Sequence, residues 1–523
     1  AVPDVTFGLK KRPPGEFVKV LTNANSTGYW YEILRDGDEK YLMQITPGNT
    51  GSHPIRIWDI ADGTEKSFTN SSGDTLYSYL SGATSAYAIQ SIQDYTIITN
   101  PQKTIGTTGN TDVPLNSGDY AFARLDTIAY NTEYVLYTGA TAPTPNTYWR
   151  VTALSVDYNT SDGNTWDDAN KDGRYAGMAQ FSFTNSECED IGGHVTVNGS
   201  AYVDSNTEHT DGSGNVTGYT QNYKTRYTAQ VVLKDGGLIK NTSESTALGK
   251  TQTVTIEGKT YTVKVVKVEP VDTYEGVAGI AFYRSPKNPD KGKLSMIKII
   301  KALFDSVNSS LTNVTAEVIG SGLYLYGSAA PTVNFLGGAV NEQMNVIGNT
   351  AQNVSRLPSQ CKHGYVAQIA NSENVDADNY YVKFYADNGT QGSGKWEECV
   401  RPNNFSSGSD PMVKGFDPAT MPHAIVNNRN NTFTFKKLDE ATANADSNDN
   451  YWKYREVGDD ITNPFPSFNG LKIQKIFFHR NRLGMVADEQ VVISRPGDYF
   501  NFFIVSALTF SDDNPIDITV SDI

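Results

Sequence analysis

Alternation of apolar and polar residues is the dominant pattern along this chain, and it predicts many short β-strands. In the first hundred residues the pattern occurs at 29–34, 40–45, 55–60 and 94–99. Asp36-Gly37 lies between the first two segments, and this dipeptide favours a tight turn, so we predict that they form a hairpin. Short strands at spacings of about ten residues are typical of a sandwich, a barrel or a propeller blade.

The same alternation returns in the second half of the chain. It predicts strands at 322–327, 380–385, 395–400, 433–435, 476–478, 490–494 and 516–520. Because the sequence stops inside this final strand, without a terminal signature, we expect the polypeptide to continue beyond residue 523.

One segment breaks the β pattern. Apolar residues there recur at steps of three and four, at Leu294, Ile297, Ile300, Leu303, Phe304 and Val307. This period predicts an amphipathic helix of about four turns.

Turn-forming residues become frequent between 117 and 290. Two stretches there, 195–202 and 254–261, resemble each other, because each joins a Val-rich strand to an x-Gly pair and then to a Tyr. Both predict a hairpin. Two interpretations stay open: two ordinary hairpins, or a duplicated β-module inside one inserted domain.

Composition excludes several classes of protein. The 523 residues include 43 Lys and Arg and 58 Asp and Glu, a net charge of −15. This balance argues against a basic nucleic-acid clamp or a binder of anionic membranes, since both need an excess of cations. The cysteines Cys188, Cys361 and Cys399 contain no CxxC pair, which argues against a disulfide scaffold and a cysteine zinc site.

Two segments partly match ligand-binding loops. Residues 389–395 fit the first seven positions of a phosphate-binding P-loop, but Trp396 stands where Ser or Thr is needed, so we predict a glycine-rich hairpin tip. Residues Asp168 to Gly173 match the first half of an EF-hand calcium loop, but Ala179 replaces the bidentate glutamate. A polar turn is the favoured interpretation of the second segment, and a calcium site stays open.

The other candidates for chemistry are explained more simply by structure. The acidic groups at 512, 513 and 517 and at 187, 189 and 190 are interpreted as solvated turns rather than paired catalytic carboxylates. His423 and His479 have no serine or cysteine nucleophile in a suitable context nearby. For Arg480 and Arg482 we expect structural ion pairs or subunit contacts. We therefore predict no catalytic, metal-binding or cofactor-binding residue.

Several short segments resemble, in their order along the chain, the tail nozzle proteins (tail tubular protein B) of short-tailed podovirus phages. They are KKRPP at 10–14, DYTIITN at 94–100, YYVKF at 380–384, MPHAIV at 421–426, NPFPSF at 463–468, FHRNRLG at 478–484, SR at 494–495, YFNF at 499–502 and SDDNPID at 511–517. The resemblance is dense from about 356 to 523, clear from about 8 to 105, and poor between 117 and 290.

The resemblance implies a mainly β fold: a β-propeller-like core with an inserted β-rich domain and a small α+β segment. The expected parts are an N-terminal β region at 1–116, which forms part of the propeller, the inserted β-rich domain at 117–290, a helix-plus-strands segment at 291–355, and propeller blades at 356–523.

The resemblance also implies a structural virion protein that is not an enzyme and holds no cofactor. Such a protein forms a homo-hexameric nozzle, the distal tube of the tail and the gate for DNA ejection into the host. Its expected partners are the tail adaptor (tail tubular protein A), tail fibres, the host cell surface, and DNA that passes without specific binding. Its expected place is the virion tail, after assembly in the bacterial cytoplasm.

Two alternatives belong to other functional classes. One is a virion-associated polysaccharide depolymerase or cell-wall hydrolase, with Asp168 or Asp172 as acid and base. The other is a carbohydrate-binding module within 117–290, where aromatic residues are frequent. They are Tyr148, Trp149, Trp166, Tyr175, Tyr202, Tyr219, Tyr223 and Tyr227. Core packing is the simpler interpretation of these aromatic side chains.

Overall fold

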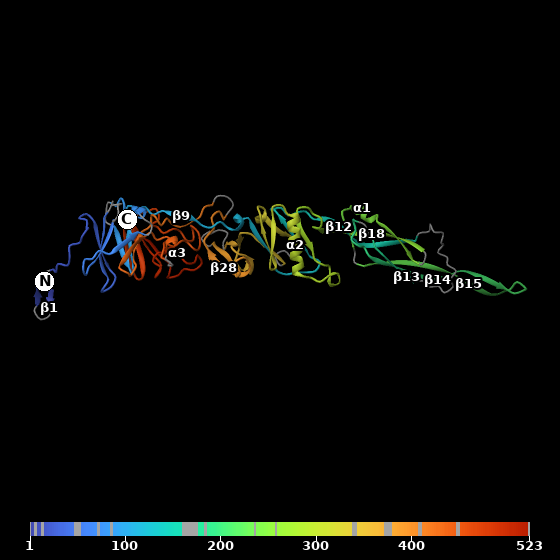
Figure 1. Cartoon of the computed structure of the whole chain (residues 1–523). Coiled ribbons are helices and arrows are strands. Elements are labelled where there is room, and N and C mark those ends of the chain that lie inside the picture. Colours follow the sequence, from blue (N-terminus) through green and yellow to red (C-terminus); the bar gives the residue numbers. More distant parts are fainter. Residues whose placement is uncertain are drawn as a thin grey trace. The chain divides into compact units, whose positions relative to one another are not determined.

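The computed structural model describes most of the chain (Figure 1). The described residues are 2–4, 8–11, 15–46, 54–70, 74–83, 87–158, 176–182, 186–234, 237–256, 259–336, 343–370, 379–405, 410–445 and 450–520. They divide into two compact units: residues 1–125, 313–332 and 345–523 form unit 1, and residues 126–312 and 333–344 form unit 2. The predicted mainly β fold is confirmed in both units.

The described residues of unit 1 form seven small sheets. Their strand orders are β1 (Val2–Asp4)-β2 (Gly8–Lys10); β3 (Tyr29–Leu34)-β4 (Lys40–Ile45)-β5 (Ile55–Asp59); β6 (Ser67–Asn70)-β31 (Thr432–Lys436)-β30 (His423–Asn427)-β8 (Tyr95–Thr99)-β7 (Ala88–Ile92); β29 (Val413–Phe416)-β9 (Thr107–Asn110); β20 (Thr315–Ile319)-β21 (Gly322–Tyr326)-β10 (Tyr120–Leu125)-β23 (Met344–Ile347); β24 (Thr350–Ala351)-β26 (Val366–Ile369)-β27 (Tyr380–Ala386)-β28 (Gln391–Cys399)-β25 (Gln360–Lys362); and β32 (Lys475–His479)-β33 (Arg482–Ala487)-β34 (Gln490–Ile493)-β35 (Ile516–Thr519). Helix α3 (Glu440–Ala445) and short 3-10 helices connect them.

Strands from the two ends of the chain share one sheet in unit 1. β8 pairs with β30, so that His423 lies opposite Ile98, and β31 pairs in parallel with β6. One hydrophobic core accordingly contains Ile97 from the first part of the chain together with Trp452 and Phe468 from the last. The sheets of unit 1 do not by themselves identify a propeller, so that arrangement stays a prediction.

In the part of unit 2 that the structure describes there are three sheets and two α-helices. The strand orders are β19 (Ile280–Arg284)-β11 (Glu133–Thr138)-β22 (Val333–Leu336); β16 (Leu238–Ile239)-β12 (Asn146–Tyr158)-β18 (Lys259–Thr273)-β17 (Thr251–Ile256); and β13 (Ala176–Phe181)-β14 (Gly193–Thr210)-β15 (Val216–Leu233). The helices are α1 (Glu244–Leu248) and α2 (Met296–Ser310), and α2 packs against β19. No described helix has the length and apolarity needed to cross a membrane. The four-part domain division stays a prediction.

The predicted helix is confirmed as α2, but its buried face differs from the predicted one: Leu294 lies before the helix and Phe304 is only partly buried. Ile299, Ile300, Leu303 and Val307 are buried, whereas Ile297 is 79% exposed. Ile297 and Ile299 lie about 200° apart around a helix, so both cannot face the same sheet. The sequence pattern alone did not show which isoleucine faces the core.

Of the two predicted hairpins in the insertion, one is confirmed and one is wrong. β17 and β18 form a hairpin with Ile256 opposite Lys259. In contrast, β14 continues straight through Asn198-Gly199, and Gly199 lies opposite Tyr227 of β15. The turn occurs instead where the Asp211 carboxylate accepts hydrogen bonds from the amides of Ser213 and Asn215. An available partner strand therefore overrode the local turn preference of Asn-Gly.

The hairpin at 29–45 and the other strands predicted in unit 1 are confirmed. The glycine-rich 389–395 segment is also a hairpin: Asp387–Thr390 form the turn and β28 begins at Gln391. Gly394 is required by close packing, because a Cβ at this position would lie 2.1 Å from the Tyr385 carbonyl oxygen. No helix N-terminus follows this loop, so it lacks the geometry of a phosphate site.

Candidate functional site: a charged joint in unit 2

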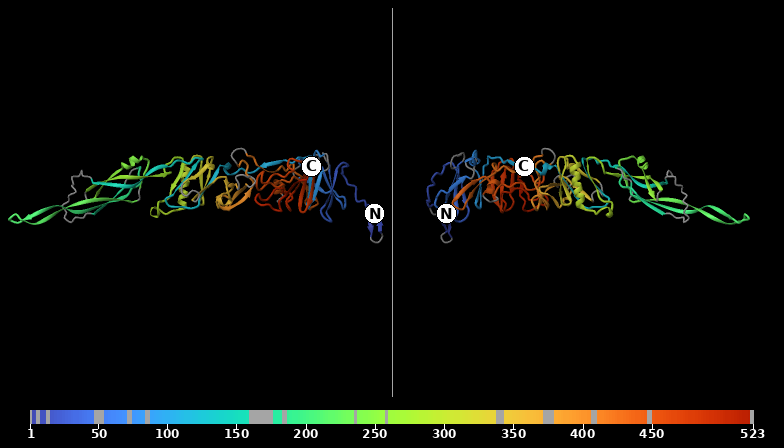
Figure 2. Two further views of the ribbon diagram at one scale, coloured as in Figure 1. Left: turned by 180° about the vertical axis from the view of Figure 1, so that it is seen from behind. Right: turned by 45° about the vertical axis from the view of Figure 1, so that its right-hand side comes forward.

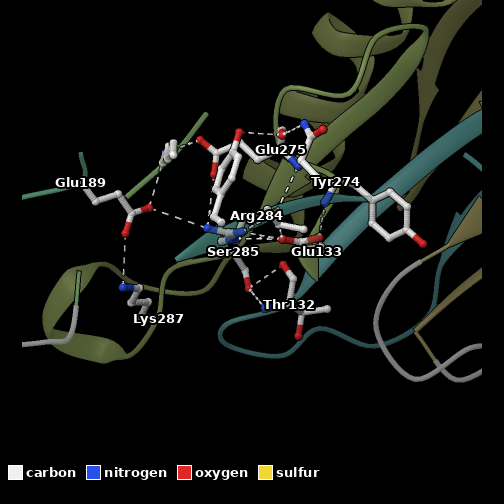
Figure 3. Close-up of polar contacts among 12 residues, drawn as sticks. Thr132, Glu133, Glu189, Tyr274, Glu275, Arg284, Ser285 and Lys287 are labelled. Atoms are coloured by element: carbon white, nitrogen blue, oxygen red, sulfur yellow. Dashed lines mark hydrogen bonds and ion pairs between the residues drawn. The ribbon is translucent and has the colours of Figure 1, made fainter. Parts of the chain in front are cut away.

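The most extensive polar network among the described residues joins two sheets of unit 2 (Figure 3). We call it the charged joint. Its members are Glu133, Glu189, Lys240, Thr273, Glu275, Arg284 and Lys287. Glu133 begins β11 and Arg284 ends β19, whereas Thr273 is the last residue of β18. The joint therefore lies at the boundary between the β12–β18 sheet and the β11–β19 sheet.

Arg284 is the centre of the joint. It lies directly opposite Glu133 in the ladder, and its Nη2 is 2.5 Å from Glu133 Oε1. Nη2 also donates to Thr273 Oγ1 at 2.7 Å, and Nη1 lies 3.3 Å from Glu275 Oε2. Because a guanidinium is planar and carries five N–H donors, one side chain can hold groups from different strands in a fixed geometry.

The carboxylate of Glu133 fixes the end of β18. Its Oε1 accepts a hydrogen bond from Thr273 Oγ1 at 2.5 Å, and its Oε2 accepts one from the amide of Tyr274 at 3.1 Å. The side chains of Glu133 and Arg284 are each 18% exposed. Partial burial weakens the screening of this pair by water and salt.

Lys240 connects the joint to β16. Its Nζ is 2.5 Å from Glu275 Oε1 and 3.6 Å from Glu189 Oε1. Burial works to lower the pKa of Lys240, but the hydrogen bond and charge of Glu275 outweigh it, and the net shift is upward. Burial, with a further contribution from Glu275, raises the pKa of Tyr148, whose hydroxyl donates to the Glu275 carbonyl at 2.9 Å.

The charges of the joint are balanced. Its carboxylates are Glu133, Glu189 and Glu275, and its cations are Lys240, Arg284 and Lys287, so the formal sum is zero. Each carboxylate lies within ion-pair distance of a cation, and none is held free as a general base. A hollow of about 420 Å³ lies beside Glu133, Arg150 and Arg284. The arrangement is suited to holding two sheets together rather than to acid–base chemistry.

The structure places the residues weighed from the sequence in different surroundings. The three cysteines are free. Asp512 and Asp513 lie in an exposed turn, but Asp517 lies in β35, where its carboxylate accepts hydrogen bonds from the amide and hydroxyl of Ser467. Tyr219 is 59% exposed, so core packing does not explain it. Tyr148 and Trp149 donate hydrogen bonds to backbone carbonyls of their own unit. Among the described residues, no group of histidine, cysteine, aspartate and glutamate side chains could hold a metal ion. Asp168 to Gly173, with Trp166 and Tyr175, lie outside the described residues.

Two expectations need correction. Glu189 is not in a solvated turn, because its side chain is only 27% exposed and pairs with Lys240 and Lys287. Among the described residues no carboxylate lies within ion-pair distance of Arg482; it donates instead to the backbone carbonyls of Ser494 and Asn514 at 2.9 and 2.8 Å, and the subunit contact expected for Arg480 and Arg482 stays a prediction. Sequence reasoning missed Glu133, Glu275 and Arg284 altogether. Each of these charged residues stands at or near the end of an apolar strand, and that position does not show which oppositely charged residue it will pair with.

His423 is a buried structural histidine. Its ring stacks on Tyr79 with centroids 3.9 Å apart, and Nδ1 lies 2.9 Å from the Met421 carbonyl oxygen. Burial lowers the pKa of His423 to about 4, so the ring is neutral at physiological pH.

Comparison with known proteins gives a consistent result. A sequence model of a family described as bacteriophage nozzle protein matches residues 1–247 and 190–523. The tail tubular protein gp12 of Escherichia phage T7 is 35% identical over 184 residues, which make up 35% of this chain. The aligned part spans about a fifth of the length of that relative, 20%.

Proposed function

We infer the role of this chain from one premise: it belongs to the bacteriophage nozzle protein family, whose model matches it over nearly its whole length. It is therefore a structural component of a phage tail and not an enzyme. The family match is the observation that carries this conclusion. The mainly β fold and the charge-balanced joint agree with a structural role.

We propose that the chain forms the nozzle at the distal end of the tail tube and the gate for DNA ejection. In this proposal six copies make a closed ring through heterologous contacts, below the tail adaptor (tail tubular protein A) and near the tail fibres. The same proposal includes a propeller arrangement, contact with the host surface and assembly in the bacterial cytoplasm. It also includes four parts of the chain, at 1–116, 117–290, 291–355 and 356–523.

The net charge of −15 supports a channel that DNA crosses without being bound. Binding to DNA draws free energy from the release of counterions when Lys and Arg neutralise phosphates. An acidic or neutral channel wall gives no such gain, and it repels the phosphate backbone. We therefore expect the channel-facing surface to lack a basic stripe.

The decisive experiment mixes the purified chain with its adaptor and images the product. We expect a closed ring of six copies bound to the adaptor, with no measurable affinity for duplex DNA at low salt. A chain that stays monomeric and does not bind the adaptor would contradict the nozzle. Strong DNA binding by the ring would contradict the passive channel while leaving the ring itself intact.

The two alternatives remain weaker. The depolymerase hypothesis assigns the acid and base roles to Asp168 or Asp172, which lie outside the described residues. No other observation favours this hypothesis. The depolymerase hypothesis would be supported if the chain hydrolysed host polysaccharide and Asp→Asn changes at these two positions abolished that activity. For the carbohydrate-binding module, binding of the 117–290 segment to host-surface glycans is the corresponding test.

A further inference from the structure

Asparagine followed by glycine occurs three times in this chain, at 198–199, 388–389 and 469–470. In such a pair the asparagine side chain can react with the next backbone nitrogen, because glycine has no Cβ to obstruct the approach. The three pairs are alike in this respect, so the fold decides which of them reacts. One lies within a strand, one in a hairpin turn, and one in a segment that is hydrogen-bonded to a distant part of the chain.

The reaction is a ring closure followed by hydrolysis. The glycine nitrogen gives its proton to hydroxide and bonds to Cγ of the asparagine, while the C–N bond of the side-chain amide breaks and ammonia leaves with a proton from water. Water then opens the cyclic imide to aspartate or to isoaspartate, and nothing is oxidised or reduced. Ring closure needs rotation about the Cα–C bond of the asparagine, so its rate depends on the hydrogen bonds that this rotation breaks.

The fold opposes this rotation at Asn198. The residue lies within β14, opposite Ala176 of β13 on one side and Thr228 of β15 on the other. Rotation at this position would disrupt both ladders. Each additional 1.4 kcal/mol or so of opening free energy slows ring closure about tenfold.

Asn469 is held by a contact with a distant segment. The amide of Gly470 donates to the carbonyl of Ile105 at 3.0 Å, and the amide of Ile105 donates to the carbonyl of Leu471 at 2.9 Å. Ile105 is buried in the same hydrophobic core as Phe468. The nitrogen that would react is therefore bonded to a core residue, and the rotation would break a tertiary contact.

Asn388 differs because its turn is exposed and held by local bonds. It lies between β27 and β28, the orange strands at the label β28 in Figure 1, which Figure 2 shows from two further directions. Residues 387–390 are all exposed. The amide of Gly389 donates to the carbonyl of Ala386 at 2.9 Å, within the turn itself. A Cβ at Gly389 would meet no described atom within 4 Å beyond its chain neighbours, so the imide ring has room to form.

The side chain of Asn388 is also polarised for the reaction. Its Oδ1 accepts hydrogen bonds from the amide of Thr390 at 2.8 Å and from the amide of Gln391 at 2.9 Å. Negative charge develops on this oxygen when the nitrogen of Gly389 attacks Cγ. Backbone N–H groups aimed at such an oxygen stabilise the developing charge, so the two donors favour the attack.

We propose that Asn388 is a site of spontaneous deamidation in the folded protein, and that Asn198 and Asn469 are protected from it. Each event replaces a neutral amide with a carboxylate next to Asp387 in the chain. It makes the net charge of −15 more negative by one charge. This inference does not depend on the proposed nozzle.

The two products affect the turn differently. Aspartate keeps an oxygen acceptor for the two backbone amides. Isoaspartate adds one carbon to the backbone between β27 and β28, whose ladder ends with Ala386 opposite Gly394. We therefore expect isoaspartate to weaken this end of the ladder.

Mass spectrometry of the full-length chain tests the proposal. The folded chain is incubated at mildly alkaline pH in water enriched in heavy oxygen and is then digested and mapped, so that each deamidated asparagine carries a labelled oxygen. We expect the label to enter at Asn388 about tenfold faster than at Asn198 or Asn469. Equal rates at the three positions would overturn the proposal.

The same chain unfolded in urea is the matched control. Without the fold the three pairs should react at similar rates, because only the neighbouring side chains then distinguish them. If Asn388 kept the same advantage in urea, the sequence and not the turn would be its cause, and the proposal would be wrong. In Asn388→Gln the label at this position should disappear, because the longer side chain closes a larger ring more slowly. Persistence of the label there would contradict the ring-closure route.

Discussion

Lowering the pH should destabilise the sheet that contains His423, through that one side chain. The ring is buried against Tyr79 and Phe435, and its pKa falls from 6.5 to about 4. The folded protein therefore resists protonation that the unfolded chain accepts. The unfolded state binds more protons between these two pKa values, so stability is complete above about pH 6.5 and falls as the pH drops towards 4.

The size of the effect follows from the two pKa values. Each pH unit in this interval costs about 1.4 kcal/mol, and the total loss approaches about 3 kcal/mol. Between about pH 7.5 and about pH 5, the contribution of His423 to the free energy of unfolding should fall by about 2 kcal/mol. Other groups titrate over the same range, so a variant must isolate this contribution.

His423→Phe provides that comparison. The phenyl ring can keep the stacking on Tyr79 but cannot take up a proton. We measure the free energy of unfolding in urea through the exchange protection of β8 and β30. Over this pH interval it should fall by about 2 kcal/mol less in the variant than in the parent chain. Equal pH dependence in the parent chain and in His423→Phe would refute the reasoning.

Two further predictions concern stability. Arg284→Met should destabilise unit 2 by about 2 kcal/mol, because it leaves the largely buried Glu133 carboxylate without its cation. Lys301→Met, at an exposed ion pair, should change the free energy of unfolding by less than about 0.5 kcal/mol. Equal effects of the two changes in urea unfolding would argue against the charged joint. Gly394→Ala should cost about 1–3 kcal/mol, because its methyl group would collide with the neighbouring strand, while Gly37→Ala, which meets nothing within 4 Å, should show no comparable loss by thermal unfolding.

Strand identity was largely predictable because it depends on local pattern. Alternation located the hairpin at 29–45, β27 and the second half of β28, and the three- and four-residue period located α2. The pattern failed at Asn198-Gly199, where the local preference for a turn competed with a long partner strand. Pairing with β15 decided that competition, and the residues opposite Asn198 and Gly199 are Thr228 and Tyr227, about 30 positions away.

The charged joint could not be predicted because each of its members is ordinary in sequence. Glu133 and Arg284 are separated by 151 residues and become opposite neighbours only when β11 pairs with β19. Glu189 was predicted to be solvated, since nothing local indicates that Lys240 and Lys287 approach it. Electrostatic partners are determined by the topology that brings strands together, not by the composition of either strand.

The sequence by itself determined the mainly β character, the position of the helix, the acidic balance and, through the order of its short segments, the family. Those properties depend on residue counts, on local periodicity or on the order of short segments. They can therefore be read from the sequence without knowing which segments contact each other in the fold. Only the tertiary structure decided that Ile97 and Phe468 share a core, that Arg284 holds Glu133, and that β14 continues straight through Asn198-Gly199. Each of these depends on contacts between distant residues, whose free energy exists only once the chain has folded.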